Sequence, residues 1–508
     1  MAEQVDVVVV GLGVGGEEVA GKLAEAGLAV VGIEHNLVGG ECPYWGCVPS
    51  KMMIRAANAL AETRRVEGLA GQAEVRPDWT PVARRIREEA TDDWDDKVAV
   101  DRFTGKGGRF VRGYGALVGP GQVRVGDDVF EARRGVVIGT GTSAVIPPID
   151  GLAGTPYWTN REAIEVEQLP ASLVVLGGGA IGLELVQVFA RFGVRVTVVE
   201  ALDRILAMEE PESSELVEKV LRADGVDFRV GAAAERVEHA GGEFTVHLAG
   251  GDRVTGEKLL VATGRRAQLG DLGLDTVGLD PGARALEVDD RMRAGERLWA
   301  VGDVTGHGAF THVAMYQAGI AVRDILGQEG PPADYRALPR VTFTDPEIGG
   351  VGLTEQQARE RGIAVRTSVS PLPESARGWI HKAGNEGFIK LVADGDRGVL
   401  VGATSAGPMG GEVLSGLAVA VHGEVPIERL RHMIYAYPTF HRAIEPPNTP
   451  PNPLTRRPTR RQNDLTHALI MGRARFTATD SRVFSVCGGD SAHDGLCLAY
   501  PLRGIHEP

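Results

Sequence analysis

Cys42 and Cys47 lie five positions apart in the segment GGECPYWGCVPSK, in a chain that has only four cysteines. Thiols this close together can form a zinc site, a structural disulfide or a dithiol that cycles with its disulfide. A zinc site needs about four ligands, and only His35 is available nearby in the sequence. A reducing cytoplasm disfavours a structural disulfide. We therefore favour a cycling dithiol as the interpretation of this pair.

The second cysteine lies at the start of an expected helix, VPSKMMIRAANALAETRRV. Pro49 suits the first turn of a helix, where its missing N–H costs nothing. The free amides of a helix N-terminus and the cation of Lys51 both favour a thiolate, so we expect a lowered pKa for Cys47. The short loop also allows the two Cα atoms to come within the roughly 5.5 Å that a disulfide requires.

The elements that must position this pair begin with a nucleotide-binding pattern. The run Val5–Val10 is typical of a strand buried on both faces. Gly11, Gly13 and Gly16 follow as G-x-G-x-x-G at the opening of an amphipathic helix, and a second strand ends at Glu34. The first glycine makes the turn, the second admits a pyrophosphate, the third permits close packing, and the acid binds a ribose.

The same pattern occurs a second time. Gly177, Gly179 and Gly182 follow the strand SLVVL, and the next strand ends at Glu200. In both units the acid lies 23 positions after the first glycine. One match would be weak, because glycine-rich turns are common, but two matches with equal spacing predict two nucleotide-binding domains.

Later segments complete these units. Strands end in Thr-Gly turns at Thr140 and Thr263, and a further strand leads to Gly302 and Asp303 before an apolar helix. An acid at the end of a strand suits recognition of ligand hydroxyls, and a helix N-cap is the alternative. The charged stretch 79–102 is expected to be a surface helix or a helical excursion of the first domain.

The predicted fold class is α/β, with two Rossmann-like domains and a C-terminal α+β domain. We expect the first nucleotide-binding domain at 1–150 with a return at 271–340, the second at 151–270, the α+β domain at 341–446, and a disordered Pro/Arg-rich tail at 447–508 that contains Cys487 and Cys497.

The gross composition excludes several classes of partner. With 508 residues and a net charge of −14, we expect neither nucleic acid nor an anionic membrane surface as a partner. No apolar run approaches the roughly 18 residues of a membrane span. The N-terminus has no basic segment of a signal peptide, so we expect a cytoplasmic protein.

In the order of these motifs, the chain resembles the FAD-dependent pyridine nucleotide–disulfide oxidoreductases, the family of dihydrolipoamide dehydrogenase, glutathione reductase and mercuric reductase. The resemblance spans residues 1 to about 445 and is most specific in GG-x-C-x4-C-V-P-S-K. It implies a homodimer in which electrons pass from NAD(P)H through flavin to a Cys42–Cys47 disulfide. From there they reach a small acceptor.

The resemblance also implies roles for individual residues. Cys47 would face the flavin, Cys42 would exchange with substrate, and Lys51 near flavin N5 would pair with Glu184. The residues that would contact FAD are Gly11, Gly13, Gly16, Glu34, Lys51, Gly115, Thr140, Gly141, Thr142, Gly302, Asp303 and Thr311. The residues that would hold the nicotinamide nucleotide are Gly177, Gly179, Gly182, Glu200 and Gly264. No metal is implied.

Two features concern the substrates. The carboxylate of Glu200 favours a free ribose 2′-OH over a 2′-phosphate, so NAD is favoured, and Arg204 keeps NADP as the alternative. Tyr44 and Trp45 stand between the cysteines, where we expect them to reshape the substrate mouth. Packing is the alternative.

The C-terminal segment YAYPTFHRAIE departs from the family's H-P-T-x-x-E, in which a histidine–glutamate pair serves the partner subunit's active site. Tyr437 holds the histidine position and Arg442 the glutamate position. Phenols titrate at about pH 10, so a tyrosine is a poor base at neutral pH. His441 is a candidate substitute, with a surface or interface histidine as the alternative.

We therefore expect a dihydrolipoamide dehydrogenase-like enzyme that reduces a small disulfide or another acceptor. One alternative is a diaphorase, quinone reductase or transhydrogenase that uses the flavin directly. A second alternative is a flavin redox sensor that does not turn over.

Overall fold

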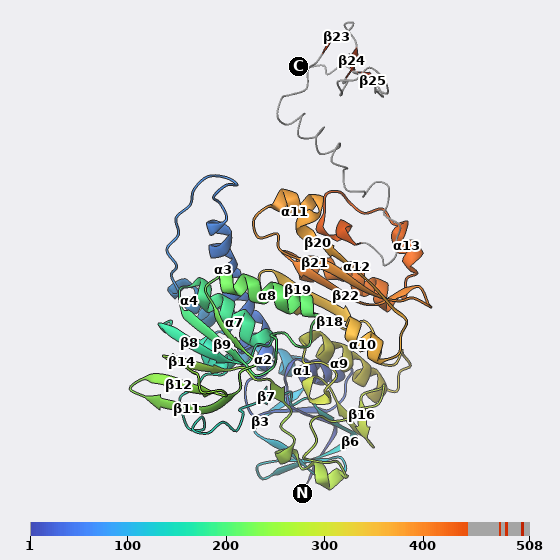
Figure 1. Ribbon diagram of the computed structural model, residues 1–508. Helices are drawn as coiled ribbons and strands as arrows, with labels where there is room; N and C mark the ends of the chain where they lie inside the picture. The colour runs from blue at the N-terminus through green and yellow to red at the C-terminus, as the bar shows by residue number, and fades with distance from the viewer. Residues whose placement is uncertain (1, 445–476, 479–482, 486–498, 502–508) are drawn as a thin grey trace, which may run out of the picture. The chain divides into compact units, whose positions relative to one another are not determined.

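The computed structural model describes residues 2–444 and three short strands further along the chain (Figure 1). The chain divides after residue 447 into two parts. In the part after residue 447, three strands pair antiparallel: β23 (Thr477–Ala478), β24 (Val483–Ser485) and β25 (Ala499–Pro501). Apart from these strands, the predicted disorder of residues 447–508 concerns positions outside the described residues, as do Cys487 and Cys497.

The first sheet is built around strand β1 (Glu3–Val10), whose valines are buried on both faces as the sequence predicts. It pairs in parallel with β2 (Val30–Glu34) and β6 (Asp128–Ile138), and the sheet order is β16-β17-β6-β1-β2-β3. Strands from before residue 139 and after residue 292 thus share one sheet. The other strands are β3 (Arg109–Arg112), β4 (Gly115–Gly119), β5 (Gln122–Val125), β16 (Arg293–Gly295) and β17 (Leu298–Ala300).

Helices on this sheet carry the chemical groups. Helix α1 (Val14–Glu25) follows β1 and contacts α9 (Thr311–Ile325). The short α2 (Glu41–Tyr44) and the long α3 (Cys47–Arg64) follow β2. The charged stretch 79–102 forms two helices rather than one, because residues 92–94 adopt positive φ. They are α4 (Thr80–Arg85), continued by a π-helical turn (Ile86–Ala90), and α5 (Lys97–Gly105).

The second nucleotide-binding unit has a parallel sheet of order β10-β9-β8-β14 and a separate antiparallel sheet of order β11-β12-β13. Helix α6 (Asn160–Glu165) precedes the parallel sheet. The parallel strands are β8 (Ser172–Leu176), β9 (Arg195–Glu200), β10 (Asp227–Val230) and β14 (Lys258–Val261), with helices α7 (Ala180–Arg191) and α8 (Pro211–Ala223). The antiparallel strands are β11 (Ala234–Ala240), β12 (Glu243–Leu248) and β13 (Arg253–Gly256). Two short strands, β7 (Ser143–Ala144) and β15 (Arg265–Arg266), join the two units.

The third unit is an antiparallel sheet of order β18-β19-β22-β21-β20, against which α12 (Gly410–His422) packs. The strands are β18 (Pro339–Thr342), β19 (Glu347–Gly352), β20 (Val365–Pro371), β21 (Phe388–Asp394) and β22 (Val399–Gly407), and the other helices are α10 (Glu355–Glu360), α11 (Ala376–His381) and α13 (Ile427–Arg431). This agrees with the predicted α/β fold class with an α+β unit at the end. The domain bounds given above remain predictions.

A buried arginine joins the three units. The side chain of Arg191 is 1% exposed and contacts Asp224 at 3.0 Å, Asp345 at 2.8 Å and Asn58 at 2.7 Å. These partners come from the second unit, the third unit and helix α3. A buried cation is stable only when its donors are satisfied, so this network fixes α3, the helix that carries Cys47.

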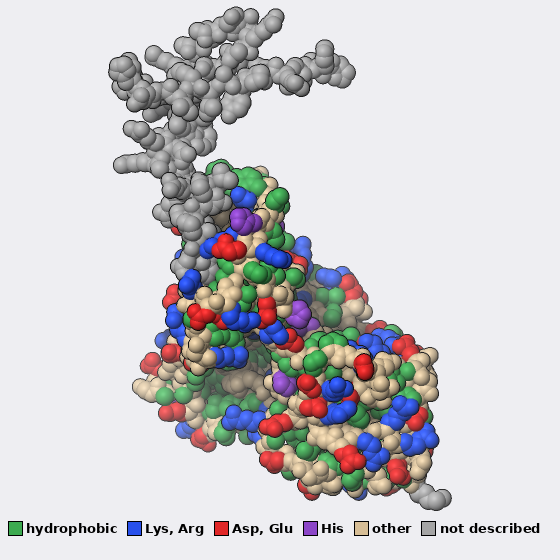
Figure 2. Space-filling model, turned by 90° about the vertical axis from the view of Figure 1, so that its right-hand side faces the viewer, with side chains coloured by type: hydrophobic (Ala, Val, Ile, Leu, Met, Phe, Trp, Pro, Cys, Tyr) green, Lys and Arg blue, Asp and Glu red, His purple; other side chains and the backbone are tan. Residues whose placement is uncertain are grey.

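On the face drawn in Figure 2, basic and acidic side chains are interspersed over the described residues. Within the part of the chain that the structure describes, none of the helices has both the length and the hydropathy needed to cross a membrane.

Candidate active site

The two glycine-rich loops leave open space where a pyrophosphate would lie. Gly11 has a φ of +90°, and a Cβ at Gly16 would lie 1.9 Å from the Gly11 carbonyl oxygen, so larger residues cannot replace either glycine without a backbone shift. At Gly13, by contrast, a Cβ would meet only the Gly139 oxygen, at 3.8 Å. The amides that open helix α1 therefore border free space.

The second loop repeats this geometry. Gly177 has a φ of +105°, and a Cβ at Gly182 would lie 2.8 Å from the Gly177 oxygen. A Cβ at Gly179 would have no neighbour within 4 Å among the described residues. Gly264, which follows β14, also has a positive φ. The equal spacing of the two sequence motifs thus corresponds to a similar backbone geometry.

The acids at the ends of β2 and β9 brace the loops. The carboxylate of Glu34 accepts hydrogen bonds from the amides of Leu12 and Asn36, both at 2.8 Å. A carboxylate has about four acceptor positions, and His35 Nδ1 also lies 3.3 Å from Oε1, so at least one position remains for a ribose hydroxyl. His35 stacks on Tyr114 with ring centroids 4.1 Å apart, next to Gly115 at the start of β4.

Glu200 occupies the equivalent position in the second unit. Its carboxylate accepts from the amides of Gly178 at 2.6 Å and Leu202 at 2.8 Å. Arg204 turns away from this acid and donates to Ser214 at 2.7 Å and to two backbone carbonyls. Its guanidinium is therefore already engaged within the second unit.

The turn after β6 brings several predicted residues together. Thr142 donates a hydrogen bond of 2.9 Å to Asp303, and Gly141 has a positive φ. Burial raises the pKa of Asp303, and the hydrogen bond from Thr142 opposes this effect. The hydroxyl of Thr140 is buried and has no hydrogen-bond partner. Gly302 precedes Asp303, and its amide donates to Gln317 at 2.7 Å.

The two thiols lie side by side and are free in this structure. The pKa of Cys47 is lowered to about 6, first because the Cys42 thiol donates a hydrogen bond to the thiolate, and further by Thr311 and Lys51. The same hydrogen bond, together with burial, raises the pKa of Cys42. Thr311 Oγ1, at the start of α9, lies 3.3 Å from Cys47 Sγ. Cys47 begins α3, as the sequence predicts.

Lys51 and Glu184 form the ion pair that the resemblance implies. Lys51 Nζ lies 2.7 Å from Glu184 Oε2, and the other carboxylate oxygen accepts from the amide of Phe343 at 2.8 Å. Lys51 also lies over the Phe343 ring, 4.7 Å from its centroid. One turn of α3 therefore places this cation beside the Cys47 thiol.

Only one of the two thiols opens into the neighbouring cavity. This cavity has a volume of about 350 Å³, and its lining includes Cys42, Pro43, Val48 and Met315 but not Cys47. Charged side chains of α1 and α5, including Arg102, also line it. A small molecule in this cavity would meet the Cys42 sulfur.

The expectation that Tyr44 and Trp45 reshape the substrate mouth is wrong. These side chains are only 6% and 7% exposed, and both belong to a hydrophobic cluster shared with the second unit. The indole of Trp45 donates to Glu165 at 2.6 Å and lies 4.2 Å from the guanidinium of Arg161. The alternative, packing, describes them correctly.

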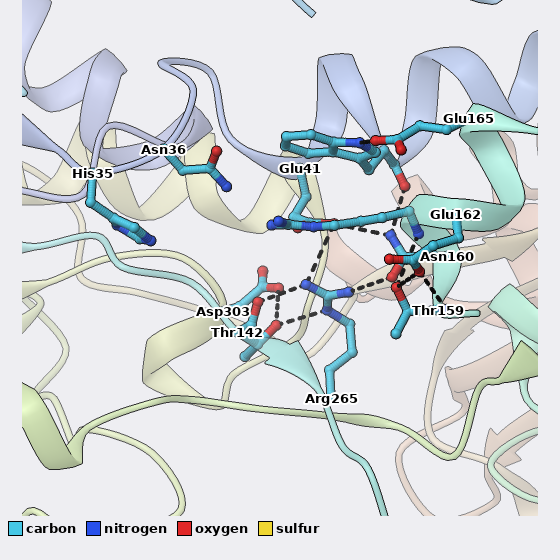
Figure 3. Close-up of polar contacts among 12 residues, drawn as sticks. His35, Asn36, Glu41, Thr142, Thr159, Asn160, Glu162, Glu165, Arg265 and Asp303 are labelled. Carbon is cyan, nitrogen blue, oxygen red and sulfur yellow. Dashed lines mark hydrogen bonds and ion pairs between the residues drawn. The ribbon is translucent and has the colours of Figure 1, made fainter. Parts of the chain in front are cut away.

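Sequence reasoning missed the network around Glu41. Its carboxylate pairs with Arg161. It also accepts from Asn160 at 3.0 Å, and Arg265 lies 3.7 Å away (Figure 3). Arg265 in turn donates to the hydroxyl of Thr142 at 3.0 Å. The partner Arg161 is 120 positions away in the chain, so no local pattern could indicate it. The only signal was a charged residue in an otherwise uncharged segment.

The C-terminal candidates, Tyr437 and His441, contact residues of their own segment, 435–442. Tyr437 is 70% exposed, and the guanidinium of Arg442 lies 5.5 Å from its ring centroid. His441 contacts Thr439 at 3.4 Å and the ring of Tyr435. The residues at the family's histidine and glutamate positions therefore contact each other, and His441 contacts residues of the same segment.

The residues present fit FAD. The open space at Gly13, the unpartnered hydroxyl of Thr140 and the buried carboxylate of Asp303 provide a phosphate cradle and acceptors for ligand hydroxyls. Among the described residues, no three or more His, Cys, Asp or Glu side chains are grouped so that they could hold a metal ion.

This fold and site define a dinucleotide-dependent oxidoreductase with a dithiol. The family model described as pyridine nucleotide-disulphide oxidoreductase matches residues 5–318, and the model of that family's dimerisation domain matches residues 338–447. The chain belongs to the pyridine nucleotide-disulphide oxidoreductase family. It is an FAD-dependent pyridine nucleotide–disulfide oxidoreductase with a dimerisation domain, which confirms the resemblance.

Relatives with different substrates match at similar levels. Mercuric reductase from Bacillus cereus is 34% identical over 81% of this chain and 66% of its own length, and dihydrolipoyl dehydrogenase from Halobacterium salinarum is 34% identical over 86% and 94%. The HOCl-induced flavoprotein disulfide reductase RclA from Escherichia coli has a TM-score of 0.75 at 26% identity, covering 86% of this chain and 97% of its own. LpdA from Mycobacterium tuberculosis has a TM-score of 0.76 at 27% identity, and the match covers 87% of this chain and 98% of LpdA.

Proposed function

We propose that Cys42 and Cys47 form the redox-active dithiol, which passes two electrons from a reduced nicotinamide nucleotide to a small disulfide or another small acceptor. One observation carries this proposal: the Cys47 thiolate is stabilised by the Cys42 thiol and Lys51, while Cys42 lines the cavity. FAD, when bound, supplies a carrier that accepts a hydride and delivers two electrons to a disulfide. Asp303 and Thr140 to Thr142 would hold it.

The neighbouring thiols can supply the proton chemistry that the missing histidine performs in relatives. The Cys42 thiol donates a hydrogen bond to the Cys47 thiolate, so moving that proton along the bond makes Cys42 the nucleophile. Cys42 then attacks one sulfur of the acceptor disulfide and releases the other as a thiolate. Cys47 attacks the Cys42 sulfur, reforms the protein disulfide and releases the second thiolate. The one proton of the dithiol leaves on the first product thiol, and the second product thiolate takes its proton from water.

The chemistry of the second loop favours NAD over NADP. The free acceptor positions of Glu200 suit a ribose 2′-OH, and its negative charge repels a 2′-phosphate. Arg204 would have to break its bond to Ser214 and its bonds to two carbonyls before it could bind a phosphate. We therefore assign NADH as the preferred donor.

We further propose that the protein acts as a homodimer in the cytoplasm, where the two thiols would be kept reducible. The third unit exposes large apolar side chains that a soluble monomer rarely leaves in water. The exposed side chains are Trp379, Ile380, Met409, Val419, Met433, Ile434 and Tyr437. The partner of this surface is a second copy of the chain, as the family's dimerisation domain supports.

An acceptor panel with the variant Cys42→Ser separates this function from the alternatives. We expect the variant to lose reduction of small disulfides by about 10³-fold or more, because the attacking sulfur is gone, while quinone reduction stays within about threefold. Equal losses with both acceptors would contradict the proposal. Disulfide reduction that survives in the variant would favour a diaphorase that uses the flavin directly. If the wild type turns over none of the acceptors in the panel, a sensor would be favoured.

A further inference from the structure

Asn160 and Arg161, consecutive residues of the second nucleotide-binding unit, contact both ends of the segment that contains the cysteines. Asn160 Nδ2 donates to Glu41 Oε2 at 3.0 Å and to the carbonyl of Trp45 at 2.8 Å. Arg161 pairs with the Glu41 carboxylate, with Nε at 2.9 Å from Oε1, and stacks on the Trp45 indole. Glu41 precedes Cys42 directly, and Trp45 lies two positions before Cys47, so these contacts bracket the redox pair.

The position of Arg161 is itself fixed. Helix α6 begins with a capping box in which Thr159 and Glu162 satisfy each other's backbone amides. The Trp45 indole is held from the other side by Glu165, at the end of the same helix. Arg161 therefore meets Glu41 from a short, capped helix rather than from a loose loop.

The charge of Glu41 matters for the redox chemistry of its neighbour. Glu41 is the one charged residue between Gly39 and Ser50. Reduction of the Cys42–Cys47 disulfide breaks the S–S bond and takes up two electrons and one proton, leaving a Cys42 thiol and a Cys47 thiolate. The segment thus gains one negative charge, which an unpaired carboxylate beside it would oppose.

Other charged and polar groups face the same region. Lys51 on α3 and Thr311 on α9 lie beside Cys47, and Arg265 lies 3.7 Å from Glu41 on the side of Thr142. Arg265 already donates to the hydroxyl and the carbonyl of Thr142. Arg161 is the only side chain among the described residues with a direct guanidinium hydrogen bond to the Glu41 carboxylate.

We propose that Arg161 is a positioning residue that raises the reduction potential of the Cys42–Cys47 pair by neutralising Glu41. The inference rests on the proposed function of these cysteines as the redox pair. Arg161 belongs to the second nucleotide-binding unit, and it would act on the two cysteines without touching either of them. The potential of the dithiol would then depend on contact between the two nucleotide-binding units.

The test measures the dithiol potential directly. The full-length holoenzyme is equilibrated anaerobically with mixtures of reduced and oxidised dithiothreitol, which supply and accept the two electrons. Free thiols are then blocked with maleimide, and the peptide containing Cys42 and Cys47 is quantified by mass spectrometry. In Arg161→Gln, we expect the equilibrium constant for reduction to fall by about tenfold, which is about 30 mV for a two-electron couple.

Companion variants separate charge from structure. Glu41→Gln should raise the constant, and the double variant should return to within about twofold of wild type, because both charges of the pair are then gone. Arg161→Lys keeps the charge and should also stay within about twofold of wild type. Arg222→Gln, which removes an exposed arginine paired with Glu218, is the matched control and should not change the constant.

The outcomes are distinct. If Arg161→Gln or Glu41→Gln has the same constant as Arg222→Gln, or if the double variant is not rescued, the role of Arg161 is wrong while the proposed function stands. If Cys42 and Cys47 never form a disulfide with each other at any dithiothreitol ratio, both are wrong. If Arg161→Gln does not fold, Glu41→Gln and Arg161→Lys decide the question.

Discussion

Lys51 and Glu184 meet across two units of the molecule, with Nζ 2.7 Å from Oε2. Lys51 stands one helical turn after Cys47, and Glu184 lies on the helix that follows the second glycine-rich loop. Glu184 also accepts the amide of Phe343 from the third unit. The Glu184 carboxylate on α7 thus connects helix α3, which carries Cys47, to the third unit.

Loss of this carboxylate should slow transfer from the nicotinamide. In Glu184→Gln, the pairing with Lys51 is lost while the shape is kept, and misplacement of a reacting group by about 1 Å can cost about 100-fold. We expect flavin reduction by NADH, followed by stopped-flow absorbance, to slow by about 10- to 100-fold. Lys22→Gln, which removes a surface pair with Glu18, is the control. A rate within twofold of wild type would show that the ion pair is not needed.

The lowered pKa of Cys47 predicts a specific pH profile. Because this thiol is the stronger acid of the pair, the reactive thiolate is present above pH 6 and is lost as the pH falls through about 6. Alkylation of the reduced protein by iodoacetamide should therefore occur at Cys47, with a midpoint near pH 6 rather than at about 8.5 as for an ordinary thiol.

The partner thiol supplies an internal control for this profile. Cys42→Ser keeps a hydroxyl that can donate to the Cys47 thiolate, whereas Cys42→Ala removes the donor. The midpoint should move to higher pH in Cys42→Ala and move less in Cys42→Ser, because loss of the hydrogen bond destabilises the thiolate. Identical midpoints in the two variants would argue against the hydrogen bond as the main cause.

The choice of nucleotide should depend on Glu200 and not on Arg204. We expect the ratio of kcat/KM for NADH to that for NADPH to fall by about tenfold or more in Glu200→Ala, since both the ribose contact and the repulsion are removed. Arg204→Ala should leave the ratio within about twofold, because its guanidinium is held by Ser214 and carbonyls. A preference for NADPH that disappears in Arg204→Ala would reverse the assignment.

Much of this architecture could be predicted from the sequence because its signals are local. Gly11 and Gly177 have positive φ, and a Cβ at Gly16 or Gly182 would meet the carbonyl oxygen of the first glycine of the same loop. The start of α3 at Cys47 follows from Pro49 in its first turn. Each of these features is decided within about one turn of backbone.

The rest could not be predicted because it depends on contacts between distant segments. Trp45 was expected at the opening of the substrate site, but the second nucleotide-binding unit covers it. Arg161, 116 positions away in the chain, stacks on its indole. The break in the stretch 79–102 comes from positive φ at residues 92–94, none of which is a glycine. The Lys51–Glu184 pair was expected only through the family resemblance, since 133 positions separate the two residues.

The most direct test of the account is an anaerobic titration of the FAD-loaded protein with NADH, followed by the visible spectrum. When two electrons have been added per subunit, we expect the new long-wavelength band that a Cys47 thiolate beside bound flavin would give, which should disappear below about pH 6 and be absent in Cys47→Ser. Bleaching of the flavin by the first equivalent with no such band, and with the same course in Cys47→Ser, would contradict a dithiol at this position.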